Sequence, residues 1–83
     1  MILHGEQIRA ARSLLGWSQA ELAKKADVAH MTVRRLEAKN GPVQGTVASL
    51  VRVQSALEQA GIEFMGGPSD GLGIRLWKKR TPT

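Results

Sequence analysis

The sequence contains no cysteine and no apolar run long enough to cross a membrane. Without cysteine, neither a disulfide framework nor a thiolate metal site can form, so the fold must depend on ordinary apolar packing. A transmembrane helix needs roughly 18 apolar residues in a row, and no uncharged run approaches that length. The first residues, MILHGEQIRAARS, become acidic and polar too early for a secretory signal peptide. We therefore expect a cytoplasmic protein without a membrane partner.

The sequence also has few residues from which a catalytic or metal centre could be built. Its two histidines, His4 and His30, are far apart, and neither has the spacing of metal ligands. No glycine-rich segment has a P-loop pattern, and the glycines of residues 66–73 are not followed by a helix that could hold a phosphate. We therefore predict that the protein is not an enzyme, has no metal site and needs no cofactor.

The charged residues of the sequence are mainly positive. Twelve Lys and Arg against seven Asp and Glu give a formal net charge of +5, and the sequence pI is about 10.5. Excess positive charge attracts polyanions such as nucleic acid or an acidic membrane surface. The 83 residues suit one small domain with a single modest core. Charge alone does not identify a nucleic-acid-binding protein, so this interpretation depends on the sequence motifs.

Apolar spacing and turn-forming residues predict four helices. We expect them at about residues 4–15, 19–26, 30–39 and 46–60. The second has the clearest start, because Ser18 and Glu21 form a capping box in which each side chain accepts from the other's backbone amide. Asp27 lies in the short turn that separates it from the third helix. The fourth helix is expected to have one apolar side, formed by Val47, Leu50, Val51, Val53 and Leu57.

After residue 61 the apolar residues alternate with a period of two, which predicts a β-hairpin. One face of the hairpin is expected to carry Ile62, Phe64, Ile74 and Leu76. An isolated hairpin is marginally stable in water, so it must pack on the helices, pair with a second copy, or both. We therefore divide the chain into a helical domain over residues 1–61, a hairpin over 62–78 and a flexible tail over 79–83.

The outward face of the third helix carries residue types that suit DNA. At about 100° per residue, Val33 and Leu36 bracket the buried side, and Met31 and Arg35 lie opposite. His30 is in the first turn, near the end of the helix that usually meets base edges. Arg35 can contact O6 and N7 of guanine together, worth roughly 1–3 kcal/mol of discrimination, and Met31 can lie against a thymine methyl. The flanks carry Thr32, Arg34 and Lys39.

The alternative for this basic face is ordinary solvation, which we would favour for an isolated arginine pair. The capped helix and tight turn that precede it favour DNA contact instead. Gln19, the first residue of the second helix, can donate to a phosphate and so position the protein without reading sequence. Its alternative is an ordinary exposed glutamine in the first turn of the helix.

Two charged residues are expected to face inward. Arg12 shares the side of the first helix that carries Ile8 and Leu15, and Glu37 is next to Leu36 on the inner side of the third helix. A buried unpaired charge is costly, so we expect an Arg12–Glu37 salt bridge. The alternative is two separate, partly exposed charges.

Three segments resemble the phage-repressor and Cro-like helix-turn-helix family, also called the XRE family. They are Ser18-Gln19-Ala20-Glu21-Leu22-Ala23, Ala26-Asp27-Val28 and Val33-Arg34-Arg35-Leu36-Glu37. The resemblance covers about residues 5–60 and implies a bundle of four or five helices that binds duplex DNA, usually as a two-fold dimer. It also implies that Gln19 contacts phosphate, that His30, Met31 and Arg35 read bases, and that Arg12 pairs with Glu37.

The sequence departs from this family's pattern at three places. Asp27 stands where glycine is usual in the turn, although Asp also tolerates the left-handed region. Ala29 stands where serine or threonine often caps the third helix, and it supplies no oxygen. A glycine that commonly follows is replaced by Lys39-Asn40-Gly41, which predicts a slightly longer third helix.

Together these observations predict a mainly α fold, a four- to five-helix Cro/repressor-type bundle followed by a C-terminal β-hairpin. We expect a double-stranded DNA-binding transcriptional regulator, a repressor that binds an inverted-repeat operator as a homodimer. The dimer interface is expected in the hairpin, at Ile62, Phe64, Ile74, Leu76 and Trp77, although Trp77 can instead cover the hairpin's outer face. The alternative function is an antitoxin or antiactivator that acts mainly by binding a protein partner.

Overall fold

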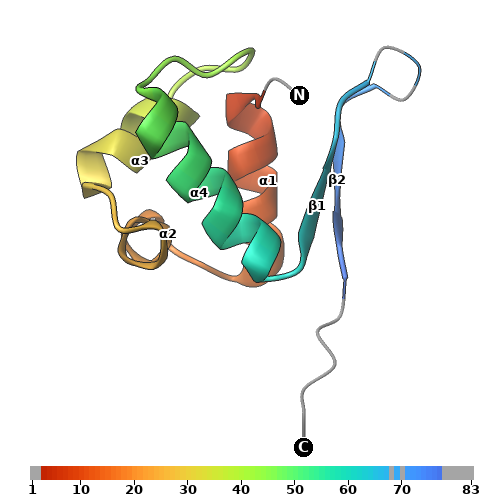
Figure 1. Ribbon diagram of the computed structural model, residues 1–83. Helices are drawn as coiled ribbons and strands as arrows, with labels where there is room; N and C mark the ends of the chain where they lie inside the picture. Colours follow the sequence, from red (N-terminus) through yellow and green to blue (C-terminus); the bar gives the residue numbers. More distant parts are fainter. Residues whose placement is uncertain (1–2, 68, 70, 78–83) are drawn as a thin grey trace, which may run out of the picture.

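Four helices and a two-stranded antiparallel hairpin make up the computed structural model (Figure 1), which describes residues 3–67, 69 and 71–77. The elements are α1 (Gly5–Leu15), α2 (Gln19–Ala26), α3 (His30–Glu37), α4 (Val47–Gln59), β1 (Ile62–Met65) and β2 (Gly73–Leu76). The predicted fold class is therefore confirmed. The predicted tail over residues 79–83, and Lys78 at the end of the predicted hairpin, lie outside the described residues.

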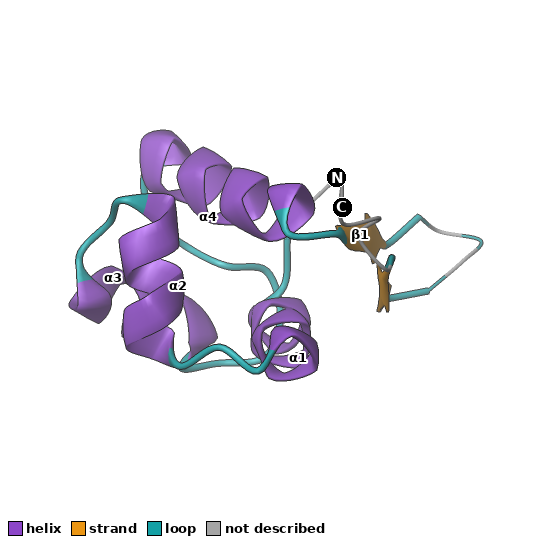
Figure 2. Ribbon diagram, turned by 90° about the horizontal axis from the view of Figure 1, so that it is seen from below, coloured by secondary structure: helices purple, strands orange, loops and turns teal. Residues whose placement is uncertain are grey.

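The core lies where the four helices meet, and β1 completes it. It consists of Leu3, Ile8, Ala11, Leu22, Ala23, Ala26, Val33, Leu36, Val53, Leu57 and Ile62. In two views at right angles, α2 and α3 lie on one side of α1 and the hairpin lies on the other (Figures 1 and 2). The bundle thus keeps the helix-turn-helix unit and the hairpin apart.

The local signals that start and stop α2 act as the sequence predicts. The Ser18 hydroxyl accepts from the Glu21 amide at 3.0 Å, and the Glu21 carboxylate accepts from the Ser18 amide at 3.0 Å. Asp27 ends the helix in the left-handed region with φ 56°. Ala29 precedes α3 without a side-chain cap, as its lack of a polar side chain predicts. The tight turn between α2 and α3 is therefore formed despite the departures from the family pattern.

The end of α3 differs from the prediction, because the helix stops at Glu37 rather than near Lys39. The cause is α1. The Arg9 guanidinium donates to the Glu37 carbonyl and to the Asn40 side chain. A Cβ on Gly5 would lie 2.8 Å from the Leu36 carbonyl oxygen, so the start of α1 occupies the space beside the last turn of α3. Lys39 consequently lies in the loop after α3, not on the flank of the helix.

The apolar side predicted for α4 is only partly buried. Val53 and Leu57 are buried and Leu50 packs against the core, whereas Val47 and Val51 are exposed. This part of the prediction was wrong, because α4 packs against α2 and β1 in a way that leaves these two valines largely exposed. The two valines therefore form an apolar surface on the outside of the bundle.

The hairpin lies against α1 and α4 with the predicted face turned inward. Ile62 pairs with Leu76 and Phe64 with Ile74, so these four side chains share one face. Ile62 belongs to the core, and Phe64 and Ile74 pack against it. Apolar burial on the helices supplies the support that an isolated hairpin lacks.

Candidate nucleic-acid interface

The outward face of α3 is open to solvent at the positions predicted to contact DNA bases. Met31 retains 49% of its accessible surface, and His30, Arg34 and Arg35 are also exposed. Thr32 is half-buried. The opposite face is buried through Val33, Leu36 and Glu37. One helix therefore has an apolar side fixed in the core and a largely basic side available to a ligand.

Two grooves flank Arg35, and the loop between α3 and α4 forms their far walls. One has a volume of about 480 Å³ and runs along Lys39, Asn40 and Gln44. The other, of about 220 Å³, lies toward Thr46 at the start of α4. Arg35 thus stands between two depressions on a surface that also carries Arg34 and Lys39.

Sequence reasoning did not assign Asn40 and Gln44 to this surface. Both are exposed beside Arg35, in the irregular loop after α3. A loop lacks the periodicity that places helical residues on a face, so their positions depend on how the loop folds back. The polar composition of the loop was the only signal in the sequence.

Beneath this surface, one carboxylate joins three helices. Glu37, only 4% exposed, accepts from Arg12 Nε at 2.8 Å and Arg12 Nη2 at 2.9 Å. Its Oε1 also accepts from Gln19 Nε2 at 3.1 Å. Arg12 donates further to the Trp17 carbonyl at 2.9 Å. Glu37 is therefore fully hydrogen-bonded, and the inward charges expected on α1 and α3 form an ion pair.

This arrangement fixes the ionisation of Arg12. The hydrogen bond to Glu37 raises the pKa of Arg12 above its ordinary value, against the opposing effect of partial burial. Arg12 therefore stays positively charged over the pH range in which proteins fold. Because α3 carries Glu37 and α1 carries Arg12, the pair joins the two helices on the same side of α3 that buries Val33 and Leu36.

The side chain of Gln19 does not extend freely into solvent. It is half-buried and directs one of its two amide hydrogens to Glu37. A glutamine amide has two donor hydrogens, so the second remains for another acceptor. Gln19 thus lies at the junction between the ion pair and the surface.

The residues expected in a dimer interface are divided between the inside and the outside of the chain. Ile62, Phe64 and Ile74 pack against the chain's own core. Leu76 is 37% exposed and Trp77 is 56% exposed, so both are open at the end of β2.

The outer face of the hairpin is more polar than its inner face. The Trp77 indole donates to the Glu63 carboxylate at 2.8 Å, and the Arg75 guanidinium lies 5.2 Å from the centre of the indole ring. Arg75 also pairs with Glu63 at 3.6 Å. Both residues are about half exposed, so this pair contributes little to stability.

Other kinds of site find little support in the described part of the chain. No group of three His, Asp or Glu side chains there could hold a metal ion. None of the helices in the same residues combines the length and apolarity of a membrane span.

A family model described as helix-turn-helix matches residues 8–53. The match contains all of α2 and α3 and ends within α4, so the hairpin lies beyond it. No curated protein matches the chain. The matched residues include Arg12, Gln19, Glu37 and the whole exposed face of α3.

Proposed function

This chain belongs to the XRE-type helix-turn-helix family of DNA-binding regulators, and we propose that it is a cytoplasmic repressor. In this proposal it binds an inverted-repeat operator as a homodimer, with α3 in the major groove, and blocks a promoter. The observation that carries the proposal is the exposed basic face of α3 above the Arg12–Glu37 pair. A helix held in one rotation can present the same side chains to every operator.

We assign base contacts to His30, Met31 and Arg35. His30 begins α3, and the other two residues follow on the face that points away from the core. The guanidinium of Arg35 can contact the O6 and N7 acceptors of a guanine at once. The methyl of Met31 can lie against the methyl of a thymine.

We assign backbone contacts to residues around this centre, namely Gln19, Thr32, Arg34 and Lys39. Gln19 would use its second amide hydrogen for a phosphate while the first stays on Glu37. Asn40 and Gln44 extend the assignment to the loop after α3, because they line the groove beside Arg35. Contacts of this kind fix the position of the protein without reading sequence.

We propose that the homodimer forms through the hairpin. Two half-sites about 34 Å apart require two copies of α3 in a fixed arrangement. Leu76 and Trp77 are the exposed apolar residues of the expected interface, and they adjoin the free edge of β2. An edge strand with apolar neighbours favours pairing with another strand. Ile62, Phe64 and Ile74 would support this interface from within each copy.

A role in binding a protein partner has one observation in its favour. Val47 and Val51 form an exposed apolar surface on α4, and such surfaces often mark protein contacts. The face of α3, by contrast, is basic with one apolar member. An antitoxin or antiactivator role would therefore use α4 rather than α3.

Selection of bound duplexes from a randomised DNA library at physiological salt tests the main proposal. We expect recovery of an inverted repeat with half-sites about one helical turn apart. Affinity for the recovered site should fall with salt, with a log–log slope of about −0.9 for each phosphate contacted. Recovery of no motif, or a slope near zero, would contradict the proposal and direct attention to the exposed valines of α4.

A further inference from the structure

Gln7 is a buried polar residue with 3% of its surface exposed. It lies in the first half of α1, one residue before the matched helix-turn-helix segment. Neither the ion pair nor the exposed face of α3 uses it. A buried amide must satisfy its hydrogen-bonding groups, so its partners indicate what it holds.

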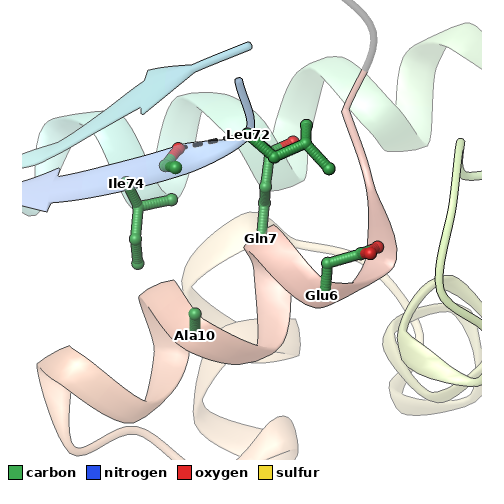
Figure 3. A pocket seen from close by; sticks show the side chains of 6 residues that line it. Glu6, Gln7, Ala10, Leu72 and Ile74 are labelled. Atoms are coloured by element: carbon green, nitrogen blue, oxygen red, sulfur yellow. Dashed lines mark hydrogen bonds between the residues drawn. The ribbon is translucent and has the colours of Figure 1, made fainter. Parts of the chain in front are cut away.

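Those partners belong to the start of α1 and to both strands of the hairpin. The Gln7 Oε1 accepts from the His4 amide at 2.9 Å. Its Nε2 donates to the Met65 carbonyl at 2.8 Å and to the Gly73 carbonyl at 3.2 Å. Figure 3 shows Gln7 reaching from α1 toward the strand that carries Ile74. Because Met65 and Gly73 face each other across the ladder, one amide binds both strands at the turn end of the hairpin.

The opposite end of the hairpin is joined to α4 through Gly61. This glycine has φ 108°, a conformation that other residues rarely adopt. A Cβ there would lie 2.6 Å from the Trp77 carbonyl oxygen. The hairpin is therefore attached covalently at Gly61 and by hydrogen bonds at Gln7.

Apolar packing between α1 and β2 is incomplete. A depression of about 260 Å³ lies between α1 and β2, lined by Ala10, Leu72 and Ile74 as well as Gln7 (Figure 3). Apolar contacts have little directional preference, so the hairpin could settle further into this space. The hydrogen bonds of Gln7 are directional and lie at its edge.

We propose that Gln7 is a positioning residue that fixes the angle between the hairpin and α1, and that it thereby sets the operator spacing accepted by the dimer. The inference rests on the proposed homodimer formed through the hairpin. This angle also determines how α3 lies relative to the hairpin, because α1 carries Arg12, which binds Glu37 of α3. In a two-fold symmetric dimer, any change in this angle occurs in both copies. The symmetry turns the two copies in opposite directions.

Operator spacing is a sensitive reporter of such a change. One base pair alters the separation of half-sites by about 3.4 Å and rotates one against the other by about 35°. A dimer with a fixed hairpin angle tolerates few spacings. A dimer whose hairpins can tilt on α1 tolerates several, because the tilt compensates for the displaced half-site.

The experiment measures binding of the full chain to inverted repeats whose central spacer varies one base pair at a time. The wild-type protein should prefer one spacing over its neighbours by about tenfold or more. Gln7→Met keeps the length of the side chain and removes its hydrogen bonds. We expect this variant to reduce the preference to about threefold or less, while affinity for an isolated half-site changes by less than about threefold.

Gln7→Glu separates the contact of this side chain with the start of α1 from its contacts with the hairpin. It keeps an oxygen acceptor for the His4 amide and so preserves the start of α1. It replaces the donor to Met65 and Gly73 by a carboxylate oxygen that repels both carbonyls. The matched control is Gln59→Met, because Gln59 is exposed on α4 and donates to Ser55 of the same helix. The control should keep the wild-type spacing preference.

The outcomes distinguish this inference from the function on which it rests. A wild-type protein that binds half-sites but shows no spacing preference would contradict the proposed dimer. A sharp wild-type preference that survives unchanged in folded Gln7→Met or Gln7→Glu would overturn the role of Gln7. Loss of folding in both variants would also overturn it, because Gln7 would then be a requirement for the fold rather than a determinant of spacing.

Discussion

Among single residues, Glu37 makes contacts that reach the first three helices. Arg12 approaches it from α1 and Gln19 from α2, while Glu37 itself belongs to α3. A buried carboxylate in this position is stabilising only while its partners remain, since its desolvation must be offset by those hydrogen bonds. The contacts between α3 and the first two helices therefore meet at one side chain.

We expect Glu37→Gln to lower the free energy of unfolding by about 2–3 kcal/mol, because it leaves Arg12 without its charged partner. The value lies below the range for fully buried pairs because the Arg12 side chain is 22% exposed. Urea denaturation measures the change. Glu63→Gln is the control, since the exposed Glu63–Arg75 pair contributes at most about 1 kcal/mol. Equal effects of the two substitutions would show that the inner pair does not carry this stability.

Arg34 and Arg35 are neighbours with different expected roles. Arg35→Ala should reduce discrimination between operator and random duplex by roughly 1–3 kcal/mol, because a base contact is lost. Arg34→Ala should weaken both complexes by the same factor, because a phosphate contact carries no sequence information. Competition binding with each variant measures the two losses. A uniform loss for Arg35→Ala would remove it from the base-reading set.

Among whole elements, α2 was the easiest to predict because its signals are local. The capping box at Ser18 and the left-handed Asp27 lie within a few residues of the ends they determine. The end of α3 was not predictable in this way. Ala38 and Lys39 are compatible with a longer helix, but α3 ends where Arg9 and Gly5 of α1 lie against its last turn. Long-range contacts of this kind leave no pattern in the sequence around the helix end.

The same contrast applies to the candidate site. The exposed face of α3 and the inward positions of Arg12 and Glu37 follow from helical geometry. The loop residues Asn40 and Gln44 could not be placed, because their positions depend on tertiary packing. The exposure of Val47 and Val51 was missed for a related reason, since periodicity gives the direction of an apolar face but not how much of it a neighbour covers.

The start of α1 and the loop after α3 are linked by a titrating contact. The Glu6 carboxylate accepts from the Gly41 amide at 2.8 Å. This hydrogen bond is the main reason that the pKa of Glu6 lies below its ordinary value of 4.5. A lowered pKa means that the carboxylate adds stability which is fully present above about pH 4.5 and is lost as the pH falls through the lower folded value.

We therefore expect unfolding free energy measured below pH 4.5 to fall more steeply in the wild-type protein than in Glu6→Gln. Glutamine keeps an oxygen for the Gly41 amide but does not titrate. Chemical denaturation at a series of pH values between about 3 and 6 measures the two slopes. Parallel curves would mean that the contact contributes nothing to the acid sensitivity of the fold.

For the whole molecule, the packing of the hairpin on the helical bundle decides how dimerisation can be tested. Removing residues 62–83 would be a poor test of dimerisation, because Ile62 belongs to the core and the hairpin covers α1. Truncation would uncover apolar surface and would change folding and association together. Substitutions at exposed hairpin positions separate an effect on association from an effect on folding.

We expect Leu76→Lys to convert the dimer into a monomer, because it places a charge at the proposed interface without removing a core residue. Sedimentation equilibrium measures the change. Val47→Lys is the matched control, since Val47 is an exposed apolar residue on α4 rather than on the hairpin. A Leu76→Lys protein that still sediments as a dimer would locate the interface elsewhere, and a monomer produced only by Val47→Lys would place it on α4.

The hydrogen bonds from Gln7 to the hairpin connect residues that are 58 and 66 positions apart in the chain. During synthesis, α1 leaves the ribosome before the strand carbonyls that its buried amide needs. Ile62, which completes the core, also follows the four helices in the chain. We therefore expect the native bundle to close only after the hairpin has emerged. Translation that stops before the hairpin releases an incomplete core, which leaves such products open to proteolysis.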